Sequence, residues 1–392
     1  MLKGRGMAVQ AFALSCLLLE LSEYLKTWLD TTKAINDPIG QRIKDVWVRA
    51  ATSHGRLKKE LDGFVAGLEE SSFFDEDTWK NIGELDCKCR VLAADFLALE
   101  QAIRFDRASL KTRSPHCERA GRLCAAANAM LESFSKKVGD PRSHQVVVSQ
   151  VEHFGADLSA IHLGCGRLSV WNLNRSIHEF GHLCGEEPNS DLGGVQKAFV
   201  AGLMAEGIVE KPTIAKEFFA DVMATYLAGP AYGCSCLFLD FNPVDRRPSE
   251  THPSHDERAH CILFALECLA ERSTGQIGVP MKRLISELEE FWAASRTNAG
   301  ARVPIAKRGV FETKVALVMM QLEEKIPLAM YGSLATAFSV KINLERGLLK
   351  RPGSADEADV LNGAWLRRLE VERVEERALG EAALKMLLRT EG

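Results

Sequence analysis

The chain has 392 residues, of which 46% are hydrophobic and 26% are charged, and its formal net charge at pH 7 is −4. This length and hydrophobic content are enough for a large core, and they predict two or three domains. The two signs of charge are mixed and no basic stripe is interleaved with aromatic residues, which argues against nucleic acid as a principal partner.

The first part of the chain is predicted to be an all-helical N-terminal domain, residues 1–139. Apolar residues recur there at spacings of three and four, the period of an amphipathic helix. This pattern covers residues 14–29, 43–68, 91–103 and 119–134. Polar breaks separate these runs, and a Gly-Asp-Pro sequence at 139–141 marks the expected domain boundary.

The N-terminus resembles the start of a signal peptide, because Lys3 and Arg5 precede a charge-free stretch at residues 7–19. The stretch continues into Glu20 without a small-residue cleavage site. It is also too short to cross a bilayer of about 30 Å as a helix. We expect an amphipathic helix here, and we find no integral membrane segment elsewhere in the sequence.

Two short β-prone runs follow, at residues 158–163 and 167–171, and they are joined by Gly164-Cys165-Gly166. This pattern predicts a tight β-hairpin. A strand at the edge of a sheet can bind an extended peptide by strand addition through backbone hydrogen bonds.

An HExxH pentapeptide, His178-Glu179-Phe180-Gly181-His182, comes next. Residues four apart share one helix face, so His178 and His182 can bind one Zn²⁺. Glu179 then lies beside the metal and can take a proton from a water molecule that the ion has made acidic. Gly181 is a poor helix former, which indicates close packing there. The motif predicts hydrolysis; the alternative is an ordinary helix with packed histidines.

A catalytic zinc needs a third protein ligand, and two positions downstream are candidates. The metzincin pattern HExxHxxGxxH is followed as far as Gly185, but Pro188 stands where its third histidine should be and has no ligand atom. The second candidate is Glu217, which shares a helix face with Asp221 at a spacing of four. This pair suits one metal ligand and one carboxylate that holds the free N–H of a ligand histidine.

A third segment begins at Thr251 and starts a helix. Ser254 and Glu257 have the spacing of a capping box, followed by an apolar run at residues 259–269. His252 precedes that helix and is either a hydrogen-bond donor to the oxyanion of the reaction or a plain loop histidine. Arg258 either pairs with Asp221 or faces solvent.

The remainder is predicted to be a helical C-terminal domain, residues 300–392. A breaker cluster at residues 296–304 precedes it, and helical patterns cover residues 311–326 and 364–388. The predicted fold class is therefore α+β and predominantly helical. Its core at residues 140–299 contains a small β-sheet or hairpin, and all-helical N- and C-terminal domains flank that core.

Eleven cysteines are scattered along the chain, and several lie in apolar helical runs, as buried free thiols do in a reducing compartment. They predict a cytoplasmic protein. Two close pairs, Cys87 with Cys89 and Cys234 with Cys236, could form a second, structural zinc site. Neither pair has the two-residue spacing of common zinc knuckles, so core or surface thiols are the preferred interpretation.

The three motifs occur in order over roughly 80 residues, and together they resemble those of the gluzincin zinc metallopeptidases. The segment from Glu217 to Asp221 is similar to the ExxAD element of the soluble repressor-cleaving peptidases and of the CAAX prenyl proteases. Residues 251–258 are similar to the THPxxxER segment of the CAAX branch. The resemblance covers residues near 160 to 270 and departs from that branch in having no transmembrane spans.

The resemblance implies a zincin-like core in which His178, His182 and Glu217 bind Zn²⁺ and Glu179 is the general base. It leads us to expect a hydrolase, a selective regulatory metalloprotease that acts on a protein or peptide substrate. An alternative is a non-catalytic metal-stabilised interaction or sensor protein, whose helical flanks bind a protein partner.

Overall fold

The structure is a computed structural model of the whole chain. It describes these residues: 10–22 except 12, 17 and 20, then 38–70, 75–106, 115–140, 145–149, 153–155, 160–164, 169–186, 190–245, 250–272, 278–298, 307–332, 334–370 and 375–388. The end of the first predicted helix, residues 23–29, lies outside these ranges.

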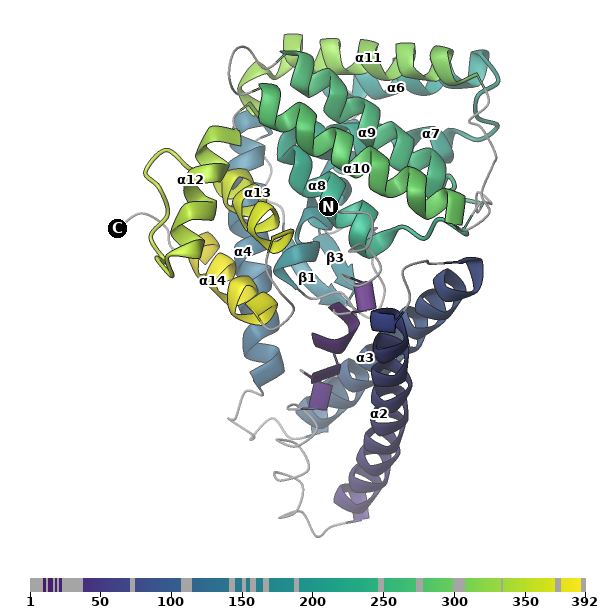
Figure 1. Ribbon diagram of the computed structural model, residues 1–392, viewed down its shortest axis with the longest axis vertical. Helices are drawn as coiled ribbons and strands as arrows, with labels where there is room; N and C mark the ends of the chain where they lie inside the picture. The colour runs from purple at the N-terminus through teal and green to yellow at the C-terminus, as the bar shows by residue number, and fades with distance from the viewer. Residues whose placement is uncertain are drawn as a thin grey trace.

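The described chain is predominantly helical, as predicted from its periodicity (Figure 1). Its α-helices are α2 (Pro38–Glu70), α3 (Glu76–Asp106), α4 (Pro115–Val138), α5 (Asn174–Glu186), α6 (Asp191–Ala205), α7 (Pro212–Ala228), α8 (Pro230–Ser235), α9 (His255–Arg272), α10 (Gly278–Asn298), α11 (Arg308–Lys325), α12 (Leu334–Glu345), α13 (Glu357–Arg368) and α14 (Glu376–Leu388). The described residues between 10 and 22 are also helical. Three short turns of helix are η3 (Val170–Asn172), η4 (Cys236–Asp240) and η6 (Pro327–Ala329).

Three short strands lie beside α5 in a mixed sheet of order β1-β3-β2. They are β1 (Gln145–Ser149), β2 (His153–Gly155) and β3 (Ala160–Gly164). The central strand β3 pairs in parallel with β1 and antiparallel with β2. Val146 and Ile161, which face each other in the β1–β3 register, are both buried.

The predicted hairpin is wrong in its second strand. The antiparallel partner of β3 is β2, which precedes it in the chain, whereas the described part of the run at 167–171 enters the 3₁₀ turn η3. Trp171 explains the difference, because its ring packs edge-on against Trp365 with centroids 5.5 Å apart. This tertiary contact outweighs the β-propensity of the run.

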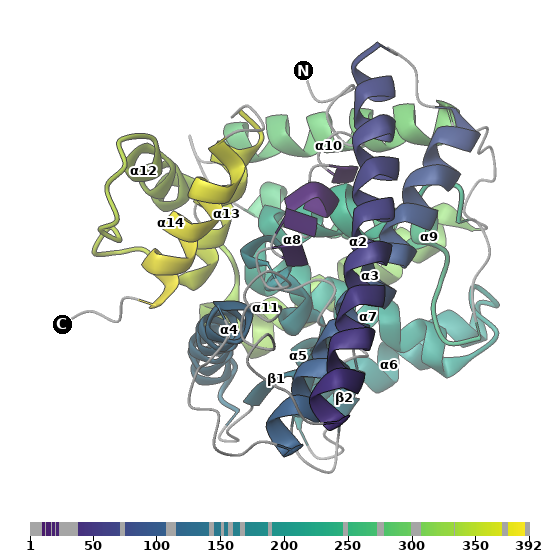
Figure 2. The ribbon, with the colours of Figure 1, turned by 90° about the horizontal axis from the view of Figure 1, so that it is seen from below.

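Helix α7 lies at the centre of the molecule and is buried on all sides. Every residue from 217 to 228 is buried, and α5, α6, α8, α9, α11 and α13 all pack against it. Figures 1 and 2 both show α6 next to α7. A helix buried all round carries charge only where that charge is paired, so Glu217 and Asp221 need partners within the core.

Small residues bring α5 and α7 close together. A Cβ atom added at Gly181 would lie 3.1 Å from the Cα atom of Ala220, and one added at Gly185 would lie 2.9 Å from the ring of Phe219. These distances leave no room for a larger side chain on this face of α5. The close packing expected at Gly181 is confirmed, and it sets the separation between the two motif helices.

The short helix α8 is held at both sides by asparagine side chains. Asn362 on α13 accepts a hydrogen bond from the backbone N–H of Ala231 at 2.8 Å and donates to the carbonyl of Ala228 at 2.7 Å. Asn174 on α5 donates to the carbonyl of Ala231 at 3.1 Å. These groups are buried, so each bond satisfies a backbone atom that water cannot reach.

The single helix predicted for residues 364–388 is instead two helices, α13 and α14, with a break that begins after Arg368. Arg368 donates a hydrogen bond to Glu376, at the start of α14, and both side chains are buried. The guanidinium group also lies over the rings of Trp171 and Trp365. Both helices present apolar faces with the same period, so the sequence pattern does not reveal the break.

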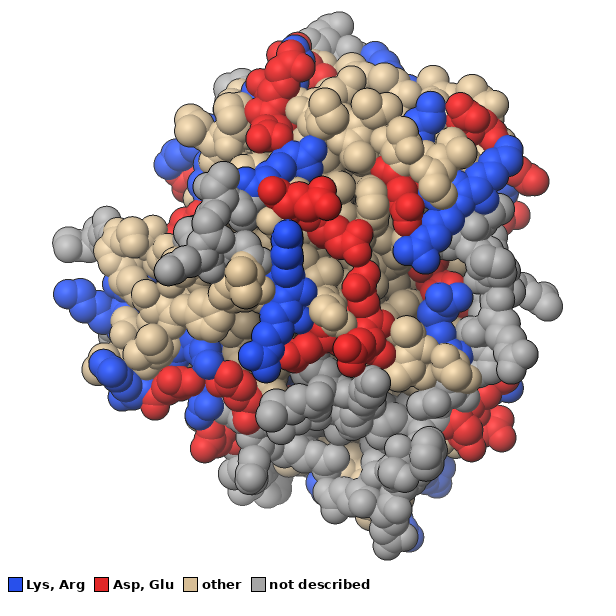
Figure 3. Space-filling model, turned by 45° about the horizontal axis from the view of Figure 1, so that its top comes forward, with Lys and Arg blue, Asp and Glu red and all other residues tan. Residues whose placement is uncertain are grey.

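Helices α2 and α3 run side by side and extend from the lower side of the molecule in Figure 1. Helix α3 is attached to the rest through Asn242, whose side-chain amide donates to the carbonyl of Trp79 at 3.1 Å. Within the described ranges, no helix combines the length and apolar character that a membrane span requires. On the face in Figure 3, acidic and basic side chains lie among uncharged ones.

Candidate metal centre

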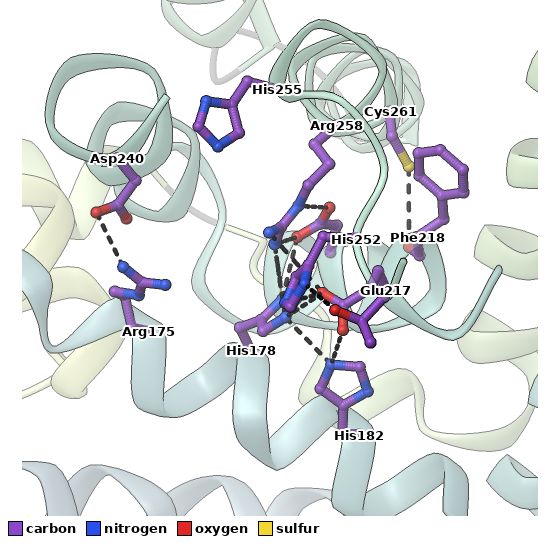
Figure 4. A network of polar contacts seen from close by, with 12 residues as sticks. Arg175, His178, His182, Glu217, Phe218, Asp240, His252, His255, Arg258 and Cys261 are labelled. Carbon is purple, nitrogen blue, oxygen red and sulfur yellow. Dashed lines mark hydrogen bonds and ion pairs between the residues drawn. The ribbon is translucent and has the colours of Figure 1, made fainter. Parts of the chain in front are cut away.

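Two imidazoles and one carboxylate meet between α5 and α7. His178 and His182 extend from one face of α5 toward Glu217 on α7, as Figure 4 shows. The two Nε2 atoms are 3.2 Å apart. The carboxylate oxygens Oε2 and Oε1 of Glu217 lie 3.3 Å and 3.2 Å from Nε2 of His178 and His182, respectively. The structure thus brings together the three residues that the sequence nominated as ligands.

The three residues, called the metal triangle below, lie as close together as the ligands of a tetrahedral zinc site, with Oε2 of Glu217 beside His178 and Oε1 beside His182. Ligand atoms 2.0–2.1 Å from zinc and separated by the tetrahedral angle are about 3.3 Å apart, close to the distances between these donor atoms. Among the described residues, this is the one group of three or more histidine, cysteine, aspartate or glutamate side chains that could hold an ion. The donor set of two nitrogens and one oxygen suits Zn²⁺.

The Oε2 atom of Glu217 offers an independent test of that fit. The atom is buried and accepts no hydrogen bond, although a buried carboxylate oxygen normally has a donor. Both neighbouring histidine nitrogens are Nε2 atoms that face the same point. A cation bound there would compensate for the hydrogen bond that this oxygen lacks, so the residues present fit a metal ion.

Asp221 orients His178 from the side opposite to Glu217. Its Oδ1 atom lies 3.0 Å from Nδ1 of His178. A carboxylate only accepts, so Nδ1 carries the hydrogen and the lone pair of the neutral ring is on Nε2, toward Glu217. Asp221 is fully buried, and Arg258 on α9 donates to both of its oxygens, at 2.7 Å and 2.9 Å. Of the two alternatives for Arg258, the structure has the ion pair.

The start of α9 explains how Arg258 reaches this position. Ser254 and Glu257 form the predicted capping box, with Glu257 N–H donating to Ser254 Oγ at 3.3 Å and Ser254 N–H donating to Glu257 Oε2 at 2.9 Å. The box fixes the first turn of the helix. The Arg258 side chain lies over the ring of Phe241, 5.3 Å from its centroid, which directs it into the core.

Tyr232 on α8 is a member of the site that the sequence did not reveal. Its hydroxyl donates to Oδ1 of Asp221 at 2.5 Å and lies 3.0 Å from Nδ1 of His178. No motif includes this tyrosine, and it is 54 residues from His178. Only the helical register of the apolar segment after α7 could have placed it on the inward face.

His252 lies at the rim of the site. Its side chain is 54% exposed, and its Nε2 atom is 3.7 Å from Oε2 of Glu217 (Figure 4). Burial lowers the pKa of His252 below its usual value, so the ring is neutral at pH 7. The ring is therefore close to the metal-binding triangle but outside the group of ligand atoms that lie within 4.8 Å of one another.

Glu179 is half-buried on α5, next to His178. It forms no hydrogen bond or ion pair with any other residue that the structure describes. The remaining polar neighbour on this helix is Arg175, which pairs with Asp240 at 3.2 Å and is directed away from the triangle (Figure 4).

The charges of the ligands depend on one another. Burial opposes protonation of His178, but the neighbouring carboxylates of Asp221 and Glu217 outweigh this and raise its pKa to about 9. Burial alone would raise the pKa of Glu217. The two neighbouring histidines lower it more strongly, so the pKa of this carboxyl lies well below its usual range. Burial also raises the pKa of Asp221, but Arg258 and His178 lower it to about 2.

Zinc affinity is expected to increase about tenfold per pH unit between pH 6.5 and about 9, because the metal must displace a proton from Nε2 of His178. The metal-free protein should show the opposite trend. His178 has a higher pKa in the folded state, so its protonation stabilises the fold fully below pH 6.5 and is lost as the pH rises through about 9. Competition with a chelator of known affinity at pH 7 and pH 8 measures the first effect; equal affinities would contradict it.

The two cysteine pairs do not form a second site with three or more possible ligands within the described residues. Cys89, Cys234 and Cys236 are buried and Cys87 is exposed. Burial raises the pKa of Cys89 and Cys234 to about 12, so these thiols are protonated at neutral pH.

Comparisons of the chain with protein-family models, with curated proteins and with solved structures find no match. The chemistry of the site is therefore inferred from its own residues.

Proposed function

We propose that this protein is a zinc-dependent peptidase of the gluzincin type, a selective regulatory endopeptidase. The observation that carries the proposal is the convergence of His178, His182 and Glu217. The two Nε2 atoms are 3.2 Å apart, and each lies 3.2–3.3 Å from one carboxylate oxygen of Glu217. The order of the three sequence motifs supports the same conclusion. Among the described residues there is no fourth ligand in the group, and a site with three protein ligands suits catalysis better than structure.

In this proposal, His178, His182 and Glu217 would hold a Zn²⁺ ion, which would lower the pKa of a bound water molecule and polarise the carbonyl group of the substrate. Glu179 takes a proton from that water and returns it to the leaving amine, so one carboxylate acts first as base and then as acid. His252 is on the rim, where its ring can donate a hydrogen bond to the developing oxyanion. Asp221 and Arg258 keep the ring of His178 in place.

The sheet offers a surface for an extended substrate. Strand β2 is at one edge of the β1-β3-β2 sheet and contacts α5. An extended peptide could add to such an edge through backbone hydrogen bonds, which tolerate many sequences, while side-chain pockets supply selectivity. A cytoplasmic location, a protein or peptide substrate and a protein partner of the helical flanks belong to the same proposal.

Metal analysis and a cleavage assay together test the proposal. We expect one zinc ion per chain after reconstitution, and cleavage within a peptide library that stops on chelation and resumes when zinc is restored. A chain that binds no stoichiometric metal would refute the proposal. Stoichiometric zinc without any cleavage of the library or of cell-derived proteins would favour the metal-stabilised sensor or interaction protein.

A further inference from the structure

Tyr232 occupies an unusual place beside the metal triangle. Its side chain is almost fully buried, and its ring is nearly parallel to that of His178, with an interplanar angle of 11° and centroids 6.3 Å apart. Its hydroxyl contacts both Asp221 Oδ1 and His178 Nδ1. One side chain thus touches the metal-facing histidine and the carboxylate that orients it.

The hydrogen-bond roles around Asp221 can be assigned from the donors present. Arg258 has donors only, and it uses two of them on Asp221. The Tyr232 hydroxyl donates its single proton to Oδ1 of the same carboxylate. Its oxygen can then accept, so the N–H at Nδ1 of His178 lies between two acceptors, Asp221 Oδ1 and Tyr232 Oη, each at 3.0 Å.

The carboxylate of Asp221 is contacted by side chains from three other helices. Both hydrogen bonds from Arg258 come from the side of α9, whereas the ring of His178 approaches from α5. Tyr232 comes from a third helix, α8, and its hydroxyl contacts both the carboxylate and the imidazole ring, so it restrains these two groups relative to each other. Burial, followed by the charge of Asp221, raises the pKa of Tyr232 well above its usual value, which keeps the hydroxyl proton in place.

The backbone that carries Tyr232 is itself fixed. The preceding residue, Ala231, has its N–H bonded to Asn362 and its carbonyl bonded to Asn174. Since Asn174 begins the helix that carries His178, the phenol and the imidazole are held in one frame. Because the backbone at Tyr232 is already fixed, its hydroxyl can hold the carboxylate of Asp221 with little further loss of side-chain conformational entropy.

We propose that Tyr232 is a positioning residue of the metal centre, which acts through Asp221 to hold Nε2 of His178 toward the metal. The inference rests on the proposed function in that it presumes metal binding by His178, His182 and Glu217. Side chains that orient metal-bound histidines commonly contribute about 10-fold to 100-fold in metal affinity. Tyr232 should contribute in that range.

The test compares zinc affinity in full-length Tyr232→Phe and Tyr226→Phe variants by chelator competition. Tyr226 is the matched control, since it is equally buried and its hydroxyl donates to the carbonyl of Ile326 at 3.2 Å, away from the triangle. Both variants lose one buried tyrosine hydroxyl. We expect zinc affinity to fall about 10-fold or more in Tyr232→Phe and to stay within twofold of wild type in Tyr226→Phe.

A double-mutant cycle with Asp221→Asn separates positioning from general loss of packing. If Tyr232 acts through Asp221, the Tyr232→Phe change should lower zinc affinity by less than about threefold once Asp221 is already replaced. Additive losses, or a Tyr232→Phe affinity within twofold of wild type, would overturn the inference while leaving the proposed function intact. Absence of zinc binding in the wild-type chain would instead refute the proposed function.

Discussion

Replacing Glu179 by Gln is expected to lower the rate of peptide hydrolysis by at least about 10²- to 10⁴-fold, the contribution typical of a general base, without loss of zinc. The amide has nearly the shape of the carboxylate but cannot accept a proton from water. Glu179 lies outside the metal triangle, so the three ligands remain. Zinc content and cleavage rate, measured on the same preparation, distinguish this outcome from loss of the metal.

Glu186→Gln is the matched control for that experiment. Glu186 ends the same helix, is exposed, and pairs with Lys216 at 3.2 Å. An exposed ion pair of this kind contributes about 0–1 kcal/mol to the stability of the fold. Its loss should therefore leave both the fold and the rate of hydrolysis unchanged. Peptide cleavage at the wild-type rate by the Glu179→Gln protein would rule out the proposed mechanism.

Replacing Arg258 by Met is expected to lower the free energy of unfolding of the metal-free protein by about 3–5 kcal/mol. Asp221 is 0% exposed and would keep its charge with only Tyr232 and His178 as donors. Loss of one partner leaves the other charge buried and poorly compensated, which is why the effect is much larger than for surface pairs. Urea unfolding in the presence of a chelator measures it.

Two further variants check the cause of that loss. Arg283→Met breaks a pair with Glu287 in which Arg283 is 83% exposed, and it should change stability by less than about 1 kcal/mol. In a double variant with Asp221→Leu, part of the stability should return, because removal of both charges leaves no unpaired ion. A single-variant loss below about 1 kcal/mol would show that Arg258 is not required to compensate Asp221.

The sequence identified the parts of the site whose spacing follows helical geometry. His178 and His182 are one turn apart on α5, and Glu217 and Asp221 are one turn apart on α7, so each pair shares a helix face. The capping box ahead of Arg258 was predictable for the same reason, since its two residues are only three positions apart in the sequence. Predictions of this kind need no knowledge of which helices are neighbours.

Contacts between distant segments were not predictable in the same way. Tyr232 reaches the site because α8 is clamped beside α5 and α13, and no local pattern contains that information. The break after Arg368 and the 3₁₀ turn at Trp171 both depend on packing around Trp365. In each case tertiary packing determined the local structure. Periodicity alone predicted one long helix over residues 364–388 and a strand at residues 167–171.

The double hydrogen bond made by Asn362 bears on where this chain can be divided. A fragment that stopped at residue 299 would retain all three donor side chains, but the N–H of Ala231 and the carbonyl of Ala228 would each lose the Asn362 side chain as a hydrogen-bond partner. Each buried backbone group without a hydrogen-bond partner lowers the free energy of unfolding by about 1–3 kcal/mol. These two groups lie just before Tyr232 in the chain. The minimal unit able to keep these three side chains in place therefore includes α13, although nearly 150 residues separate Asn362 from Glu217 in the sequence.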